Sequence, residues 1–335
     1  MASVLLVACA GPSDSPETAG ETARESAQAR DSTGESGETA AETARESGGE
    51  TAAETGETGI DTGETGTIPE PHGGPCTAYA EALAVSTVQD PALNELSGLA
   101  PSRRNPGILW THEDSGGAAE LYALDTLGAT VATLTLEGVT NTDWEDIALG
   151  PCGDDTCLYV GDIGDLGTDR SEFAVLVVPE PVLDGTPALS AKPEVRPFTY
   201  PGEPEDAEGL TLTADGDPLI VTKRTDATAG LYRLPAGETV LDPLADIATG
   251  AEGEDLTARA TAADLWLDPP VLLVRTYLHL ATYDATDLTA PGEPEALAFA
   301  LELQGEAVAW DVEEGGFWQV GEGSEPTLWY TACAE

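Results

Sequence analysis

From Cys76 to the C-terminus, short apolar segments of Val, Leu, Ile, Tyr and Trp alternate with turns rich in Gly, Pro and Asp. This texture is typical of short antiparallel strands. It continues without interruption to residue 335, a length that suits one large β-domain. The pattern therefore predicts an all-β fold for residues 76–335.

One short motif recurs five times in this region. Each copy places a Ser, Thr or Glu before a small or polar residue and then an apolar one. The copies are Ser97-Gly98-Leu99, Glu145-Asp146-Ile147, Glu208-Gly209-Leu210, Thr261-Ala262-Ala263 and Glu306-Ala307-Val308. Successive copies begin 48, 63, 53 and 45 residues apart, which is close to the length of one propeller blade.

Two further apolar segments follow each motif. We expect second strands at 108–110, 158–160, 219–221, 271–274 and 317–320, and third strands at 121–124, 173–176, 231–234, 279–283 and 328–330. The fifth unit ends at the C-terminus without an outer strand, which residues 78–88 can supply. The sequence therefore predicts a single five-bladed β-propeller. A six-bladed ring with an extra blade in residues 235–260 is the alternative, while a β-sandwich would leave the repeated motif unexplained.

The first 75 residues have a different composition. Residues 10–75 are almost wholly Gly, Glu, Thr, Ala and Ser, so they cannot bury enough apolar surface to fold, and we expect a disordered acidic spacer. Cys9 follows Leu6-Val7-Ala8, which resembles a bacterial lipoprotein lipobox. That resemblance implies a signal at residues 1–9 and a lipid anchor on Cys9. The domain would then be tethered to a membrane of the cell envelope, periplasmic or at the surface. An ordinary N-terminus with one stray thiol is the alternative.

The other four cysteines form an even set. Cys152 and Cys157 flank a Gly-Asp-Asp-Thr turn and could clip a hairpin, while Cys76 and Cys333 lie at the two ends of the predicted ring. A Cys76–Cys333 disulfide would lock the closure of that ring. Such pairing implies an oxidising compartment outside the cytoplasm.

Charge narrows the range of partners. The chain has 62 acidic and 13 basic residues and a formal net charge of -49, which would repel nucleic acid polymers and anionic membranes. With only two lysines and eleven arginines, a phosphorylated substrate would need a divalent cation to help hold it.

The motif residues should converge, because the innermost strands of a propeller line its central channel. Glu145, Glu208 and Glu306 would then crowd near one axis, with the hydroxyl groups of Ser97 and Thr261 beside them. Ionised carboxylates so placed must share protons, hold water or bind a cation. An oxygen-only set suits calcium (Ca²⁺) better than zinc. Alternatively, each acid accepts backbone hydrogen bonds and the motif only helps the strand to fold.

These residues resemble the soluble calcium-activated nucleotidases (apyrases), which are five-bladed propellers with calcium on the axis. The resemblance lies in the order Ser97, Glu145, Glu208, Thr261 and Glu306, where the nucleotidases carry serine in place of Thr261. The phrases at 95–99, 143–148 and 161–165 are also similar to uncharacterised secreted bacterial propellers, sometimes grouped with phytase-like proteins. The resemblance implies that the five motif residues form the calcium shell.

Loops that leave the second strands should lie on the same face as the motifs. Asp114, Asp162 and Asp165 in these loops could position a nucleophilic water, so they are the candidate catalytic residues. Candidate substrate-binding residues are Arg170, Lys223, Arg224 and Arg275. The alternative is that these acids populate turns and that the bases pair with the surplus of acids.

Two functions fit these features. The first is a lipid-anchored binding or scaffold module whose axial face recognises a protein or glycan and whose calcium stiffens the ring. The alternative is a calcium-dependent phosphohydrolase that acts on nucleotides or other phosphate esters. The fold cannot decide between them.

Overall fold

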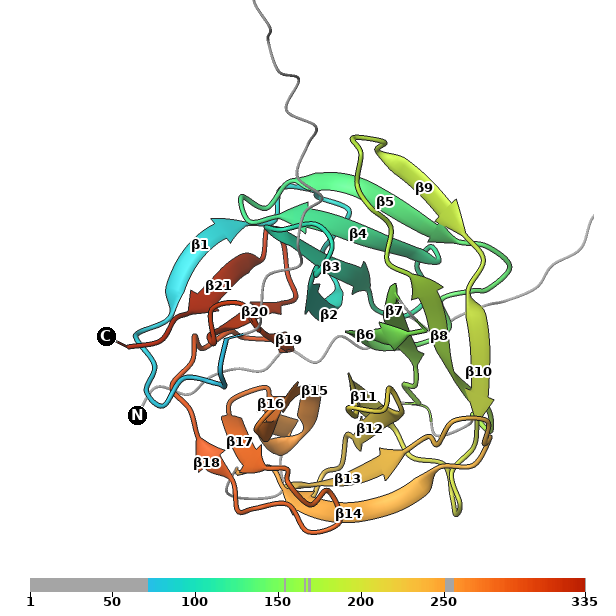
Figure 1. Cartoon of the computed structure of the whole chain (residues 1–335), viewed down its shortest axis with the longest axis vertical. Helices are drawn as coiled ribbons and strands as arrows, with labels where there is room; N and C mark the ends of the chain where they lie inside the picture. Colours follow the sequence, from blue (N-terminus) through green and yellow to red (C-terminus); the bar gives the residue numbers. More distant parts are fainter. Residues whose placement is uncertain (1–71, 154, 166, 168–169, 251–255, 335) are drawn as a thin grey trace, which may run out of the picture. The chain divides into compact units, whose positions relative to one another are not determined.

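The computed structural model describes residues 72–334 except 154, 166, 168–169 and 251–255. The predicted lipid-bearing Cys9 and the predicted spacer up to residue 71 lie outside the described residues. Five separate sheets surround one axis, as Figure 1 shows, and they confirm the predicted five-bladed β-propeller. Within the described part of the chain, no helix is long and apolar enough to cross a membrane.

Each sheet is one blade, and its first strand lies nearest the axis (Figure 1). Blade 1 contains β2 (Leu96–Pro101), β3 (Ile108–Glu113), β4 (Glu120–Asp125) and β5 (Thr130–Leu136). Blade 2 contains β6 (Trp144–Cys152), β7 (Asp155–Asp162), β8 (Phe173–Pro179) and β10 (Glu194–Phe198). Blade 3 contains β11 (Ala207–Leu212), β12 (Pro218–Thr222), β13 (Thr228–Arg233) and β14 (Asp242–Ala248). Blade 4 contains β15 (Ala260–Leu267), β16 (Pro270–Thr276), β17 (Leu280–Asp284) and β18 (Glu295–Ala296), and it follows a short 3-10 turn, η1 (Leu256–Ala258).

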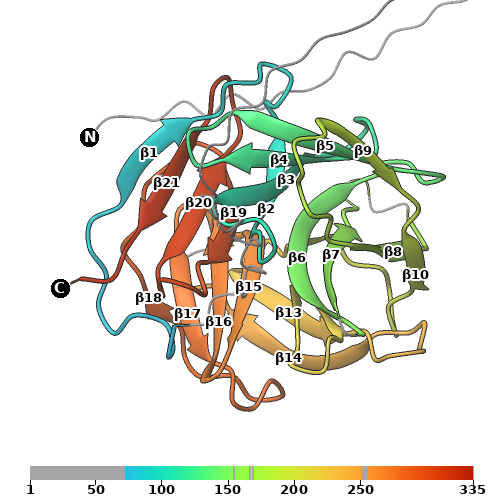
Figure 2. The same ribbon diagram turned by 45° about the horizontal axis from the view of Figure 1, so that its top comes forward.

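Blade 5 joins the two ends of the ring. It contains β19 (Gly305–Trp310), β20 (Phe317–Gly321) and β21 (Thr327–Thr331), and its outer strand is β1 (Leu83–Thr87), which pairs antiparallel with β21. Figure 2 shows β1 beside β21, although the two strands lie at opposite ends of the propeller's sequence. The predicted closure by residues 78–88 is therefore confirmed.

The six-bladed alternative is wrong. Residues 242–248 form β14, which completes blade 3, so no strands remain there for a further sheet in the described residues. The structure also has a strand that the sequence did not predict. Residues Ala188–Ala191 form β9, which pairs in parallel with β5 and covers the outer edge of blade 1. A covered edge cannot pair with another chain.

Apolar side chains fill the space between neighbouring blades. The described residues form five buried clusters, and each cluster joins one pair of adjacent blades. Trp110 of blade 1 packs in one cluster with Leu158 and Val160 of blade 2, for example. Successive side chains of a strand point to opposite faces of its sheet, and consecutive residues of strands such as β11 and β19 are all buried. Each blade therefore packs on both faces and depends on a neighbour on either side.

Both predicted disulfides are present. Cys76 pairs with Cys333 across 257 positions of sequence, and Cys152 pairs with Cys157 across the β6–β7 hairpin. An isolated β-bridge between Tyr79 and Cys333 places the start and the end of the propeller side by side next to the Cys76–Cys333 disulfide. These pairs indicate a protein that folds outside the cytoplasm, in an oxidising compartment.

The two disulfides should contribute unequally to stability. Because the Cys76–Cys333 loop is far longer, the chain-entropy account predicts that Cys333→Ser lowers the free energy of unfolding by about 5 kcal/mol, against about 2 kcal/mol for Cys157→Ser. Urea denaturation of each variant measures this. Equal losses, or a larger loss for the hairpin bond, would contradict the idea that Cys76–Cys333 locks the ring.

Candidate functional site

A β-bulge lies at the start of every innermost strand. The pairing register between the first and second strands of each blade shifts once, and each shift leaves a motif residue unpaired: Ser97 (with Gly98), Glu145, Glu208, Thr261 or Glu306. A bulge takes a side chain out of the regular alternation and aims it elsewhere. We call these five residues the bulge ring. Its three glutamates are buried, with 6%, 6% and 5% exposure in sequence order.

The two hydroxyl groups of the bulge ring connect adjacent blades. The Ser97 hydroxyl donates to the backbone carbonyl of Glu145 at 2.5 Å, which joins blades 1 and 2. The Thr261 hydroxyl donates to the carbonyl of Gly305 at 2.9 Å, which joins blades 4 and 5. Both residues therefore have a structural role whether or not an ion binds beside them.

The three glutamates of the bulge ring influence one another electrostatically. Burial, and then the Glu208 carboxylate, raise the pKa of Glu145 and of Glu306 well above the ordinary value. Burial raises the pKa of Glu208 to about 8, although the ammonium of Lys223 opposes that rise. Lys223 forms an ion pair with Glu208, and its ammonium also donates to the Tyr277 hydroxyl at 3.1 Å.

A second set of equivalent residues lies next to the bulge ring. In every blade, the residue before the bulge pairs with the last residue of the second strand. The residues that directly follow these five strand ends are Asp114, Ile163, Lys223, Tyr277 and Glu322. We call these five the loop ring. Burial and then Asp114 raise the pKa of Glu322 to about 7, so the loop ring shares the electrostatic field of the axis.

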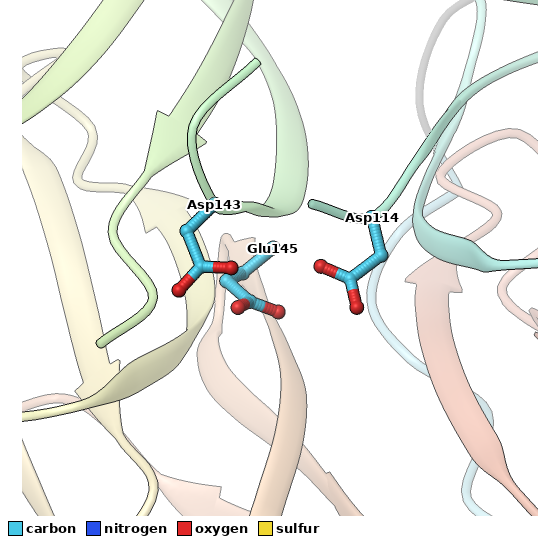
Figure 3. Close-up of side chains that lie close together, drawn as sticks. All are labelled: Asp114, Asp143 and Glu145. Carbon is cyan, nitrogen blue, oxygen red and sulfur yellow. The ribbon is translucent and has the colours of Figure 1, made fainter. Parts of the chain in front are cut away.

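Three carboxylates from two blades come close enough to hold a metal ion. One oxygen of Asp114, one of Asp143 and one of Glu145 all lie within 4.8 Å of one another. Figure 3 shows Asp114 reaching toward Asp143 and Glu145 from the opposite side of the site. Burial and then Asp114 raise the pKa of Asp143 to about 6, and burial raises that of Asp114. A cation there would relieve the repulsion among the ionised forms.

The loop after β7 supports this acidic cluster. The amides of Ile163 and Gly164 donate to the carbonyl of Asp143, at 3.1 and 3.2 Å. A Cβ atom at Gly164 would overlap the carboxylates of Glu145 and Asp143, so only glycine lets the loop approach them this closely. Asp162 accepts a hydrogen bond from the backbone amide of Asp143 at 3.2 Å. This loop therefore fixes the direction of two candidate ligands.

Two of the predicted catalytic aspartates lie in this same loop. Asp162 forms an ion pair with Arg170 at 2.8 Å, and the Arg170 guanidinium also donates to the Gly164 carbonyl at 2.6 Å. Asp165 is buried, donates its amide to Asp206 at 2.7 Å and accepts the Arg170 amide at 3.1 Å. These contacts make Arg170, Asp162 and Asp165 parts of one hydrogen-bonded loop, whereas Asp114 is a member of the acidic cluster.

The remaining two predicted substrate-binding arginines contact protein groups. Arg224 binds both carboxylate oxygens of Glu205, at 2.6 and 2.9 Å, and Asp246 at 2.6 Å. Arg275 is 0% exposed. Its guanidinium donates to the carbonyl groups of Ala307 and Val320 and to Glu302, at 2.7, 3.1 and 2.6 Å, so it joins blade 4 to blade 5.

The residue that follows each bulge-ring residue is small in four blades, as Gly98, Gly209, Ala262 and Ala307, and is Asp146 in blade 2. The buried Asp146 carboxylate accepts the amides of Leu210 at 2.9 Å and Ala263 at 3.3 Å, as well as that of its neighbour Ile147. One carboxylate thus ties the inner strands of blades 2, 3 and 4 together.

Sequence reasoning missed three residues of this site. Asp143 and Glu322 belong to the electrostatic cluster, and Asp146 is a structural acceptor. A weak signal for Asp143 exists, because an acidic residue also stands two positions before the motif in blades 1 and 3, as Glu95 and Asp206. Nothing in the sequence alone distinguishes Asp146 from an ordinary strand residue.

Comparisons with known proteins give only distant likenesses. The chain matches no protein-family model and no curated protein sequence. Among solved structures, a PQQ-bound aldose sugar dehydrogenase from Streptomyces coelicolor aligns at 14% identity and a TM-score of 0.47, covering 77% of this chain and 99% of that one. Glutaminyl cyclase from Myxococcus xanthus aligns at 12% identity and a TM-score of 0.44, covering 78% and 100%. Alignments this weak identify neither a substrate nor a cofactor, and the resemblance to calcium-activated nucleotidases stays a prediction.

The raised pKa values predict how stability depends on pH. The folded protein keeps protons on Asp143 and Glu322 (pKa about 6 and 7) that the unfolded chain releases near pH 4. In chelator, the melting temperature should therefore fall as the pH rises from about 4.5 to about 8, by roughly 5 °C or more. Thermal scans across this range test it. A melting temperature that rises toward pH 8 would contradict the electrostatic description of the site.

Proposed function

We propose that this protein is an extracytoplasmic β-propeller that binds calcium at its axial face and serves there as a binding or scaffold module. The observation that carries the proposal is the convergence of Asp114, Asp143 and Glu145, whose oxygens lie within 4.8 Å of one another. Glu145 belongs to the predicted calcium shell, while Asp143 is new to it. The proposed site is therefore displaced from the axis toward blades 1 and 2.

The donor chemistry supports calcium among the common metal ions. Each of the three side chains offers only carboxylate oxygen, which hard cations prefer, and the cluster contains no cysteine or histidine. Calcium accepts irregular geometry and completes its shell with water and backbone carbonyls. A bound cation would also favour the ionised forms of the three acids, whose pKa values are raised by burial and then by nearby carboxylates.

The occupation of the basic side chains favours a binding module over the phosphohydrolase alternative. A phosphate group needs cationic or amide donors that point toward it. Arg170, Arg224 and Arg275 each donate to protein acceptors, and Lys223 is paired with Glu208. The phosphohydrolase alternative then rests on the resemblance to nucleotidases. A protein or glycan partner would meet the axial face through the ion and the surrounding loops.

The proposed location follows from the disulfides and the N-terminal sequence. Two disulfide bonds suit an oxidising compartment. Lipidation at Cys9 would attach the chain to a membrane of the cell envelope, and the acidic sequence of residues 10–75 would hold the propeller away from that surface.

Calcium binding can be tested with a single-ligand variant. Titration calorimetry on metal-stripped protein should show binding, and Asp143→Asn should weaken it at least about tenfold because one charged ligand is lost. Asp215→Asn, at an exposed turn between β11 and β12, is the matched control and should bind calcium like the parent. The proposal fails if the parent protein takes up no calcium, or if both variants bind equally.

A phosphate-release assay separates the two functions. Nucleoside di- and triphosphates and phytate should remain intact with the protein, with and without calcium, because the four candidate substrate-binding residues are all paired with acids. Calcium-dependent release that Glu208→Gln abolishes would establish the phosphohydrolase instead.

A further inference from the structure

Lys223 holds an unusual position among the residues around the axis. It follows β12 directly, and its backbone amide donates to Asp206 at 2.8 Å, so the strand pairing of blade 3 fixes where its side chain begins. That side chain is only 10% exposed. Of the ten residues in the bulge ring and the loop ring, five carry carboxyl groups, and Lys223 is the single base.

The ammonium group of Lys223 has the kinds of contact that a bound cation would have. It contacts a carboxylate oxygen of Glu208 and the phenol oxygen of Tyr277, and it lies 5.3 Å from the centre of the Tyr277 ring. A carboxylate oxygen such as that of Glu208 is also a ligand for hard metal ions. An ammonium group is a compact charge that can take such a place.

The charge of Lys223 reaches well beyond its direct partner. It lowers the pKa of Glu145, Glu306 and Asp114, each of which burial raises. These groups come from blades 1, 2 and 5, whereas Lys223 comes from blade 3. One side chain therefore neutralises part of the field that the whole ring of carboxylates creates.

We propose that the ammonium of Lys223 takes the place of a metal ion beside Glu208 and Tyr277 and so limits the number of cations that the axial face can bind. The inference rests on the proposed cation site at Asp114, Asp143 and Glu145, which Lys223 leaves open. Its removal would free a second site at Glu208. Lys223 is thus a residue that determines stoichiometry, in contrast to the substrate-binding role predicted from sequence.

The test compares calcium stoichiometry in two lysine variants. Lys223→Met should bind about one more calcium ion per chain than the parent protein, because the freed carboxylates need a counter-ion. In chelator its melting temperature should fall by roughly 10 °C, since a buried charge has lost its partner, and calcium should restore it. Lys192→Met is the matched control. This other lysine is exposed between β9 and β10, so its loss should change neither quantity.

A double variant keeps the test decisive if Lys223→Met folds poorly. Glu208→Gln combined with Lys223→Met removes both partners of the ion pair, so it should fold in chelator and bind no extra calcium. The inference is overturned if Lys223→Met binds as much calcium as the parent, or if calcium cannot rescue a Lys223→Met chain whose double variant folds. A parent protein that binds no calcium would end the proposed function, whereas the difference between Lys223→Met and the parent would still test Lys223.

Discussion

The carboxylic acids that the innermost strands aim at one axis cannot all be ionised in a buried space unless positive charge lies among them. Glu145, Glu208 and Glu306 are each nearly inaccessible to solvent, and each stands at a bulge that turns it out of its strand. The fold places them there because blades repeat. Lys223 supplies part of the compensating charge, whereas no basic side chain among the described residues forms an ion pair with Asp114, Asp143 or Glu145.

The site depends on the closure of the ring. Its groups come from all five blades, and contacts between neighbouring blades, rather than within one blade, set their separations. Hydrogen bonds that Ser97 and Thr261 donate and that Asp146 accepts connect adjacent inner strands, and Arg275 connects blades 4 and 5. Pairing of β1 with β21 and the Cys76–Cys333 disulfide close the ring in blade 5. Opening the ring there would separate the charged groups of the site, so stability and ion binding are coupled.

Much of the fold could be predicted from sequence, because strand periodicity and the repeated motif are local signals. All fifteen predicted strand positions fall within observed strands, apart from single residues at their ends, and both cysteine pairs are confirmed. The sequence missed β9, since its four residues pair with a strand more than fifty positions away and carry no distinctive alternation. Long-range parallel pairing leaves little local trace.

The candidate site was harder to predict than the fold. Position in the repeat identified the bulge ring, and composition suggested a cation, but the roles of the basic residues depend on where each long side chain ends. Arg275 lies inside β16 and Lys223 directly after β12, and Arg275 turns into the interface between blades 4 and 5 whereas Lys223 turns toward the carboxylates. Asp143 joined the site only because Gly164 lets the neighbouring loop pack against it. Packing between blades determines where these side chains lie, and no local sequence pattern predicts that packing.

The location of a bound ion tests this account most directly. A crystal structure of the metal-stripped propeller soaked in manganese, with anomalous scattering used to find the ion and calcium used to confirm it, would show where the cation lies. We expect a peak within about 2.1–2.6 Å of oxygens from Asp114, Asp143 and Glu145, with the Lys223 ammonium still on Glu208. No peak at the axial face, or an ion that displaces Lys223 and lies beside Glu208, would contradict it.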